Sequence, residues 1–210
     1  MKKHIYVFLV FLFPLFVNTQ KSQVLISSPS DSPVVGDCLA DGVVFYIFKP
    51  GDAGYVEGET HGLVVSLDQG EARWGCNGTD LPAVPNVRSG PADLDTIVGA
   101  RIGDGETNTD GMVQDCPNGN AGDWCRDKGP EWFLPSRGEL NELYKWYSKD
   151  KAGNNKLIVN CGGVKIANDW HWSSSDLRES DAWGQFFSTG GEVYGIYKKT
   201  GGILRAVRKF

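Results

Sequence analysis

Histidine is scarce in this sequence, and none of its cysteines forms a Cys-x-x-Cys pair. Three histidines occur in 210 residues, and one of them, His4, lies in the apolar N-terminal stretch. Zinc sites in proteins depend on closely spaced cysteine and histidine ligands. The sequence therefore argues against a zinc site, and we expect the protein to need no metal or other cofactor.

Positive charge is also in deficit. The chain has 21 lysines and arginines against 26 aspartates and glutamates, which gives a net charge of −5. Proteins that bind nucleic acids generally need a basic surface to neutralise phosphates. We therefore expect no nucleic-acid partner.

Long hydrophobic runs are missing except at the N-terminus. The run covers residues 5–17 and follows Lys2 and Lys3. It is too short to cross a bilayer comfortably, and a positive start before an apolar core is typical of a signal peptide. We predict that residues 1–20 are a signal peptide and that the mature chain is not transmembrane. The protein should be secreted or displayed at the cell surface, with the periplasm as an alternative.

The remaining sequence predicts a tether followed by one α+β domain. Residues 21–35 are rich in serine and proline, which is typical of a flexible tether, and the domain should cover residues 36–210. Residues 43–48 and 63–67 are β-branched and aromatic, so they predict buried strands. Ser136 and Glu139 have the spacing of a capping box, which predicts a helix that begins there.

Other parts of the chain carry weaker signals. Residues 77–128 are rich in Gly, Asn, Asp and Pro, so we expect an irregular region with at most a short helix near residues 93–102. From Leu157 onward, paired glycines predict short strands and hairpins. The last strand should cover residues 203–210.

The five cysteines are Cys38, Cys76, Cys116, Cys125 and Cys161. Export makes disulfides plausible, and the odd number leaves at least one thiol that is free or bonded to another chain. The stretch "CPNGNAGDWC" is a short, turn-rich loop, so it favours a disulfide between Cys116 and Cys125.

Four blocks of the sequence resemble a known family. They are "WFLPSRGELNELY", "WHWSSSD", "AWGQFFSTGG" and "LRAVRKF", and together they resemble the DUF1566 family, also called the Lcl C-terminal domain family. The resemblance covers roughly residues 36–210. The matching positions are Trp132, Leu134, Pro135, Ser136, Glu139, Leu140, Trp172, Ser173, Ser174, Ser175, Ala182, Trp183, Phe187, Gly190, Arg205, Ala206, Val207, Arg208 and Phe210.

The resemblance implies a fold and a class of function. Members of this family are thought to adopt a C-type-lectin-like fold, with short antiparallel strands and hairpins, one or two helices and long irregular loops. The family is frequent in exported proteins of Bacteroidetes. It is related to variable proteins of diversity-generating retroelements, in which a fixed scaffold displays changeable residues. Trp172, Trp183 and Phe187 match fixed family positions, so we expect them inside the domain.

Three further patterns could be functional or structural. His171 and Ser173 could take part in a catalytic triad, but no Gly-x-Ser-x-Gly motif accompanies them, so a structural role is favoured. Residues 106–111 resemble the start of a calcium loop, but Pro117 stands where the bidentate carboxylate belongs, so a turn-forming loop is favoured and calcium is only weakly indicated. One of Arg205 and Arg208 could be buried against a carboxylate while the other faces outward, with Glu139 as a candidate partner.

The stretch from Gly184 to Gly202 is the candidate binding face. Its residues fall at positions that the family pattern leaves free, and exposed tyrosines are good recognition residues. An ordinary hairpin surface is the alternative. The predicted ligand-binding residues are Gln185, Phe186, Glu192, Tyr194, Ile196, Tyr197 and Lys198.

We therefore expect an exported, non-enzymatic binding module that recognises a surface glycan or a protein ligand through its C-terminal hairpins. One alternative is a structural component of a surface or fimbrial assembly. Another is an enzyme of the formylglycine-generating type, because "LPSRGELNEL" faintly resembles a block of those enzymes. They need a reactive cysteine pair near the C-terminus, and the last cysteine here is Cys161, so this alternative ranks last.

Overall fold

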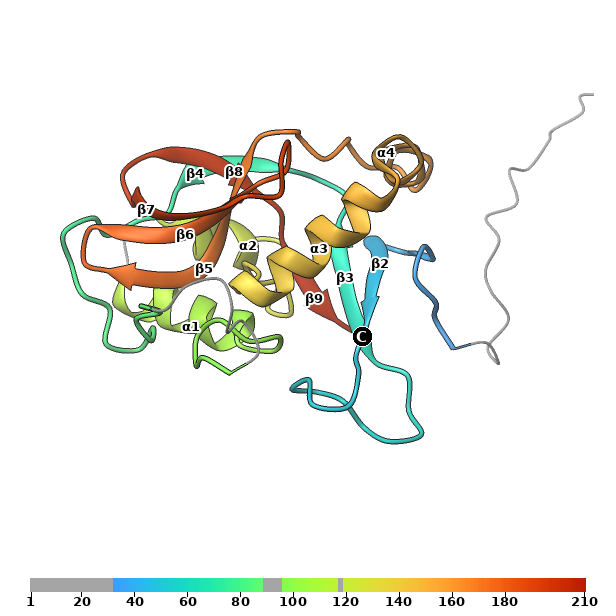
Figure 1. Cartoon of the computed structure of the whole chain (residues 1–210), viewed down its shortest axis with the longest axis horizontal. Coiled ribbons are helices and arrows are strands. Elements are labelled where there is room, and N and C mark those ends of the chain that lie inside the picture. Colours follow the sequence, from blue (N-terminus) through green and yellow to red (C-terminus); the bar gives the residue numbers. More distant parts are fainter. Residues whose placement is uncertain (1–31, 89–95, 117–118) are drawn as a thin grey trace, which may run out of the picture. The chain divides into compact units, whose positions relative to one another are not determined.

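A computed structural model of the chain describes residues 32–88, 96–116 and 119–210. The predicted signal peptide and residues 21–31 of the predicted tether lie outside this part of the chain. Residues from Ser32 to Phe210 form one compact unit, shown in Figure 1. No helix in the described ranges is long and apolar enough to cross a membrane.

The described residues form two sheets and four helices, so the predicted α+β class is confirmed, whereas the predicted number of one or two helices is too low. One sheet has the order β1-β2-β3-β9 and the other the order β4-β8-β5-β6-β7, with antiparallel pairing except for one parallel bridge between β5 and β8. The strands are β1 (Cys38–Leu39), β2 (Gly42–Ile47), β3 (Gly62–Ser66), β4 (Gly70–Arg73), β5 (Trp170–Arg178), β6 (Asp181–Phe186), β7 (Glu192–Tyr197), β8 (Gly201–Leu204) and β9 (Val207–Lys209). The helices are α1 (Gly105–Asp115), α2 (Ala121–Arg126), α3 (Arg137–Lys149) and α4 (Lys151–Asn160).

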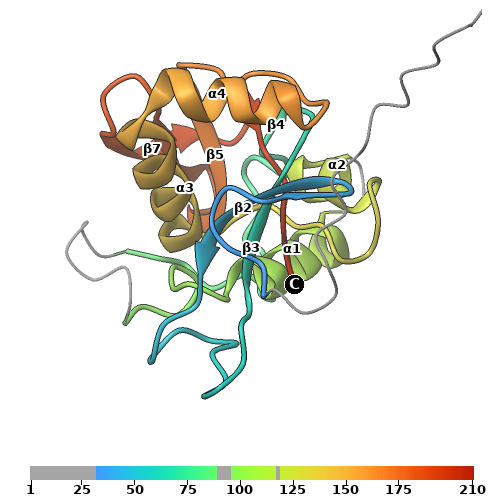
Figure 2. The same cartoon turned by 90° about the vertical axis from the view of Figure 1, so that its right-hand side faces the viewer.

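The predicted strands at residues 43–48 and 63–67 appear as β2 and β3, in the middle of the first sheet. Both are buried on both faces, which explains why their sequences are continuous apolar runs. Val43 and Val65 pack into a core shared with α3 and α4, and Val44 and Val64 into a core shared with α1 and α2. Figure 2 shows the two pairs of helices on either side of β2 and β3.

Helix α3 begins as the capping box predicts. The Ser136 hydroxyl accepts a hydrogen bond from the Glu139 backbone N–H at 3.2 Å, and a Glu139 carboxylate oxygen accepts one from the Ser136 backbone N–H at 2.8 Å. Leu140, Leu143 and Tyr147 are buried against the first core. The predicted helix start is therefore confirmed at the level of its hydrogen bonds.

The prediction of an irregular region over residues 77–128 is wrong in part, because α1 and α2 lie within it. Helix α1 has no apolar periodicity, since its buried face carries Asn108 and Thr109, whose side chains bond to backbone carbonyls. Helix α2 begins with an Asn120–Asp123 capping box. The helix expected near residues 93–102 falls partly outside the described residues, and residues 96–102 form turns and bends.

Two predictions for the C-terminal part also need correction. Leu157 belongs to α4, so strands begin only at β5. The predicted last strand, residues 203–210, is two strands in different sheets, because Arg205 and Ala206 carry the chain from β8 to β9. This segment contains no glycine or proline that would mark the break between the two strands.

The partner of Arg205 is not Glu139. Its guanidinium is buried and donates to the backbone carbonyls of Ser66 and Asp68, each at 2.9 Å, and of Val164 at 2.5 Å. Burial lowers the pKa of Arg205 to about 10. Backbone carbonyls replace the carboxylate that a buried arginine was expected to need.

The disulfide prediction is wrong as well. The bonds are Cys38–Cys161 and Cys76–Cys116, and Cys125 is a buried free thiol. Cys125 lies on α2 and packs into the second core. Asn120 caps α2, and this helix directs the Cys125 side chain into the core. The Cys125 and Cys116 sulfurs are therefore not bonded, although the two residues are close in sequence.

Mass mapping should find these two disulfides in exported protein. Cys125 should resist iodoacetamide in the native state and react in denaturant, because it is fully buried and burial raises the pKa of its thiol. The Cys38–Cys161 bond joins residues 123 positions apart, so replacing both cysteines with alanine should lower the free energy of unfolding by about 4 kcal/mol. Recovery of a Cys116–Cys125 peptide would contradict this structure.

Glu139 should make stability depend on pH. Burial raises its pKa to about 7, although the N–H groups of Ser136 and Gly103 favour the charged form. A pKa above the unfolded value of 4.5 means that the contribution to stability is complete below pH 4.5 and is lost as the pH rises through 7. The free energy of unfolding, measured relative to that of Glu139→Gln, should therefore fall by roughly 3 kcal/mol across this range.

Glu142→Gln is the matched control, since Glu142 lies on the same helix and pairs with Lys145 near the surface. This control should show no comparable pH-dependent difference between pH 4.5 and pH 7. A stability difference between wild type and Glu139→Gln that grows with pH would show that the two backbone donors outweigh burial.

Candidate functional site

The predicted binding face corresponds to the hairpin of β6 and β7, in which β7 is an edge strand. The structure describes the side chains of six of its seven residues, which fall into three groups by exposure. Tyr197 and Phe186 are exposed, by 57% and 37%. Glu192 and Ile196 are partly buried, and Gln185 and Lys198 are buried. The side chain of Tyr194 lies outside the described part of the structure.

Gln185 was expected outside the domain and lies inside it. Its amide nitrogen donates to Asn141 Oδ1 on α3 and to the Gly190 carbonyl, both at 3.1 Å. Only 2% of the residue is exposed. β6 is covered on both faces over this stretch, so the simple in-and-out alternation of a hairpin does not apply. Gln185 therefore ties the hairpin to α3 and is a poor candidate for contacting a ligand.

Lys198 was also predicted to contact a ligand, but it is fully buried. Its ammonium group lies 2.8 Å from a carboxylate oxygen of Asp176, and both side chains are fully buried. It also lies 4.5 Å from the ring centroid of Trp74. Burial raises the pKa of Asp176, while the contact with Lys198 favours its charged form. This ion pair fixes the end of β7 against the core, because removing either partner would leave a buried charge alone.

Glu192 joins the start of β7 to the start of α3. Its carboxylate lies 2.9 Å from Arg137, whose side chain is almost fully buried. The Arg137 guanidinium also lies 3.6 Å from the ring centroid of Trp183, in a cation–π arrangement. Neither Arg137 nor Asp176 was predicted from the sequence to be a functional residue. An arginine at the first position of a helix is a weak signal by itself.

The two exposed aromatic residues of the hairpin lie at opposite ends of it. Tyr197 pairs with Asp181, whereas the Phe186 backbone N–H bonds to the Gly191 carbonyl next to the turn. Five residues of strand separate these positions, or roughly 16 Å. Among the described side chains, the hairpin thus offers two separate aromatic contacts.

The "WHWSSSD" segment of β5 is structural. His171 is buried, stacks on Phe187 with ring centroids 4.1 Å apart, and has its Nδ1 3.1 Å from the Asp169 carbonyl. Burial lowers the pKa of His171 to about 3. The Ser173 and Ser175 hydroxyls donate to the carbonyls of Trp183 and Gly99. None of the hydrogen bonds in the described part of the chain joins His171 to a serine.

Residues 106–111 lie inside α1, so the predicted turn-forming loop is wrong and the weakly indicated calcium loop is not formed either. Glu106 pairs with Lys209, and Asp110 pairs with Arg126. Within the described ranges, no cluster of three or more His, Cys, Asp or Glu side chains could hold a metal ion.

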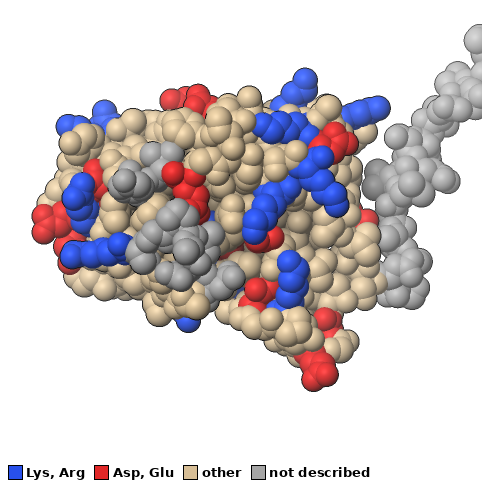
Figure 3. Space-filling view, viewed as in Figure 1, with Lys and Arg blue, Asp and Glu red and all other residues tan. Residues whose placement is uncertain are grey.

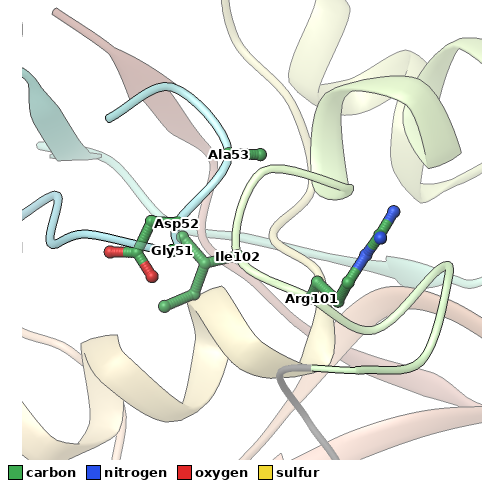
Figure 4. A pocket seen from close by; sticks show the side chains of 5 residues that line it. All are labelled: Gly51, Asp52, Ala53, Arg101 and Ile102. Carbon is green, nitrogen blue, oxygen red and sulfur yellow. The ribbon is translucent and has the colours of Figure 1, made fainter. Parts of the chain in front are cut away.

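A small pocket of about 230 Å³ lies where residues 51–53 approach residues 101–102. Asp52 accepts hydrogen bonds from the Tyr46 hydroxyl and the Lys49 backbone N–H. Arg101 is paired with Asp104 at 3.0 Å. Figure 4 shows Arg101 pointing away from Asp52, so the charged groups do not converge on a common point in the pocket. The side chains that line this pocket therefore form no arrangement suited to catalysis.

The fold is similar to that of a solved structure, the crystal structure of a fimbrial protein from Bacteroides ovatus ATCC 8483. The sequences are 17% identical and the TM-score is 0.52. The match covers 88% of this chain and 46% of that chain, so this chain spans about half the length of the fimbrial protein. The sequence matches no protein-family model and no curated protein.

Substitutions of core residues in the hairpin region should lower the free energy of unfolding much more than substitutions of surface residues. Phe187 is fully buried and contacts Tyr144, Tyr147 and His171, so Phe187→Ala should lower the free energy of unfolding by about 3–5 kcal/mol. Tyr197→Ala should change it by less than about 0.5 kcal/mol, because the side chain is exposed. Denaturant unfolding of the oxidised protein measures both. A large loss for Tyr197→Ala would show that this side chain is packed.

Proposed function

We propose that this protein is an exported, non-enzymatic component of a surface or fimbrial-type assembly. The observation that carries the proposal is the fold shared with a fimbrial protein over 88% of this chain. Two disulfides support the exported location, because such bonds persist in oxidising compartments. The C-type-lectin-like fold and the relation to the DUF1566 family belong to the same proposal and rest on the sequence blocks described above.

A non-enzymatic role fits the way in which reactive residue types are used. His171 is buried and has a low pKa, and the serines of β5 bond to backbone carbonyls. The formylglycine-generating alternative requires a reactive cysteine pair near the C-terminus. The last cysteine, Cys161, is instead bonded to Cys38, so it offers no thiol for that chemistry.

Recognition of a surface glycan or protein ligand is the second candidate function. Tyr197 and Phe186 favour it, because large aromatic side chains exposed on a rigid hairpin suit recognition. Burial of Gln185 and Lys198 reduces the area that this hairpin can offer. We therefore rank recognition below assembly.

Shearing of native cells tests the assembly proposal. The protein should be recovered in the sheared surface fraction together with other surface polymers. Immunogold labelling of intact cells should detect it on the cell surface. A strain that lacks the gene is the control for antibody specificity. Recovery of the protein only as a free periplasmic monomer would overturn the proposal.

A further inference from the structure

A basic surface lies along the outer side of α4. Ala152, Asn155, Lys156 and Val159 follow one another at helical spacing and line a hollow of about 350 Å³ together with Lys165. Asn155 Oδ1 accepts the Ile166 backbone N–H at 2.8 Å, which holds the segment after α4 against the helix. The basic patch is defined here as Ala152, Asn155, Lys156, Val159, Val164 and Lys165.

The basic patch combines unpaired positive charge with exposed apolar side chains. Val159 and Val164 are exposed by 45% and 52%. In the described part of the chain, neither Lys156 nor Lys165 has a carboxylate within ion-pair distance. Residues 145–165 contain five lysines and one aspartate, although the whole chain carries −5. Such a patch on an acidic protein calls for an acidic partner surface.

The same chain presents a surface of the opposite kind. The loop of residues 49–61, the acidic loop, joins β2 to β3 and contains Asp52, Glu57 and Glu59 against one lysine. Residues 53–59 are continuously exposed, and they include Tyr55 and Val56. Its exposed apolar and acidic side chains thus complement the valines and lysines of the basic patch.

The acidic loop is held in a fixed shape. Asp52 accepts bonds from the Lys49 backbone N–H at 2.7 Å and from the Tyr46 hydroxyl at 2.8 Å. At its far end, His61 lies 2.7 Å from Glu59 and 3.1 Å from the Phe210 carbonyl oxygen. Gly103, with φ +97°, lets Ala53 approach so closely that a Cβ at residue 103 would lie 2.4 Å from the Ala53 Cβ. A loop that is already ordered loses little conformational entropy when a partner binds.

The two surfaces lie at opposite ends of the domain. Figures 1 and 2 show α4 at the top and the loop between β2 and β3 at the bottom in both views. In Figure 3, basic side chains gather on the side where α4 lies, and acidic side chains mark the opposite tip. The basic patch therefore cannot contact the acidic loop of its own chain. A contact between them must join two copies, and it leaves one of each surface free for the next copy.

We propose that copies of this chain associate head to tail, with the acidic loop of one copy docked on the basic patch of the next. Tyr55 and Val56 would pack against Val159 and Val164, while Glu57 and Glu59 would face Lys156 and Lys165. That this contact operates at the cell surface rests on the proposed function. The contact itself can be measured with the purified chain alone.

Sedimentation of the purified, disulfide-bonded mature chain tests the contact. At about 0.1 mM protein and low ionic strength, the wild type should form concentration-dependent oligomers, and raising the salt to about 0.5 M should weaken them. The double variants Lys156→Glu/Lys165→Glu and Glu57→Lys/Glu59→Lys should each bind themselves at least about tenfold more weakly. An equimolar mixture of the two variants should associate again, because each acidic surface then meets a basic one.

Matched controls carry the same change of charge at exposed positions outside both surfaces. They are Arg88→Glu/Lys199→Glu and Glu71→Lys/Glu179→Lys, and they should associate like the wild type. Circular dichroism checks that every variant is folded. A mixture that fails to associate while both variants are folded would overturn the pairing of these surfaces.

A wild-type chain that stays monomeric at this concentration and low salt would also overturn the contact. That result leaves the proposed function standing if the protein is still found in the sheared surface fraction. Conversely, a chain that oligomerises through these surfaces but is never found at the cell surface would overturn the function and leave the contact intact.

Discussion

The two sheets depend on one buried cation. Arg205 lies where the chain leaves β8 and enters β9, and its guanidinium donates to three carbonyls from segments that are far apart in sequence. These carbonyls lie at the end of β3, just after β3 and after α4, so one guanidinium holds these segments together. The crossing from one sheet to the other is therefore fixed by a side chain, while the neighbouring Leu204 and Ala206 pack into the second core.

The same use of buried charge decides what the C-terminal hairpin can do. From the sequence, Lys198 and Glu192 were expected at the surface. In the structure Lys198 forms an ion pair with Asp176, and Glu192 forms one with Arg137. A charge is stable there only with a fixed partner, so each pair also fixes the position of β7. The hairpin that was expected to display variable side chains is held to the domain at both ends by these pairs.

Sequence reasoning succeeded where one local rule decides the structure. The capping box of Ser136 and Glu139 and the apolar runs of β2 and β3 needed no knowledge of distant partners, and Trp172 was correctly placed inside. It failed where the outcome depends on contacts across the fold. Cys116 pairs with Cys76 because α1 and the segment after β4 meet in space, which no spacing rule contains. α1 was missed because its buried face is polar and bonded to backbone.

The basic patch and the acidic loop combine charge with exposed apolar side chains. Once the charges of the hairpin are paired inside, Lys156 and Lys165 of the basic patch and Glu57 and Glu59 of the acidic loop remain at exposed positions. Exposed valines accompany the lysines, and an exposed tyrosine and valine accompany the glutamates. Charge alone is screened within about 8 Å at physiological salt, so it orients partners more than it holds them. Apolar contact at the same places is what would give such an association its strength, which is why the valines matter as much as the lysines.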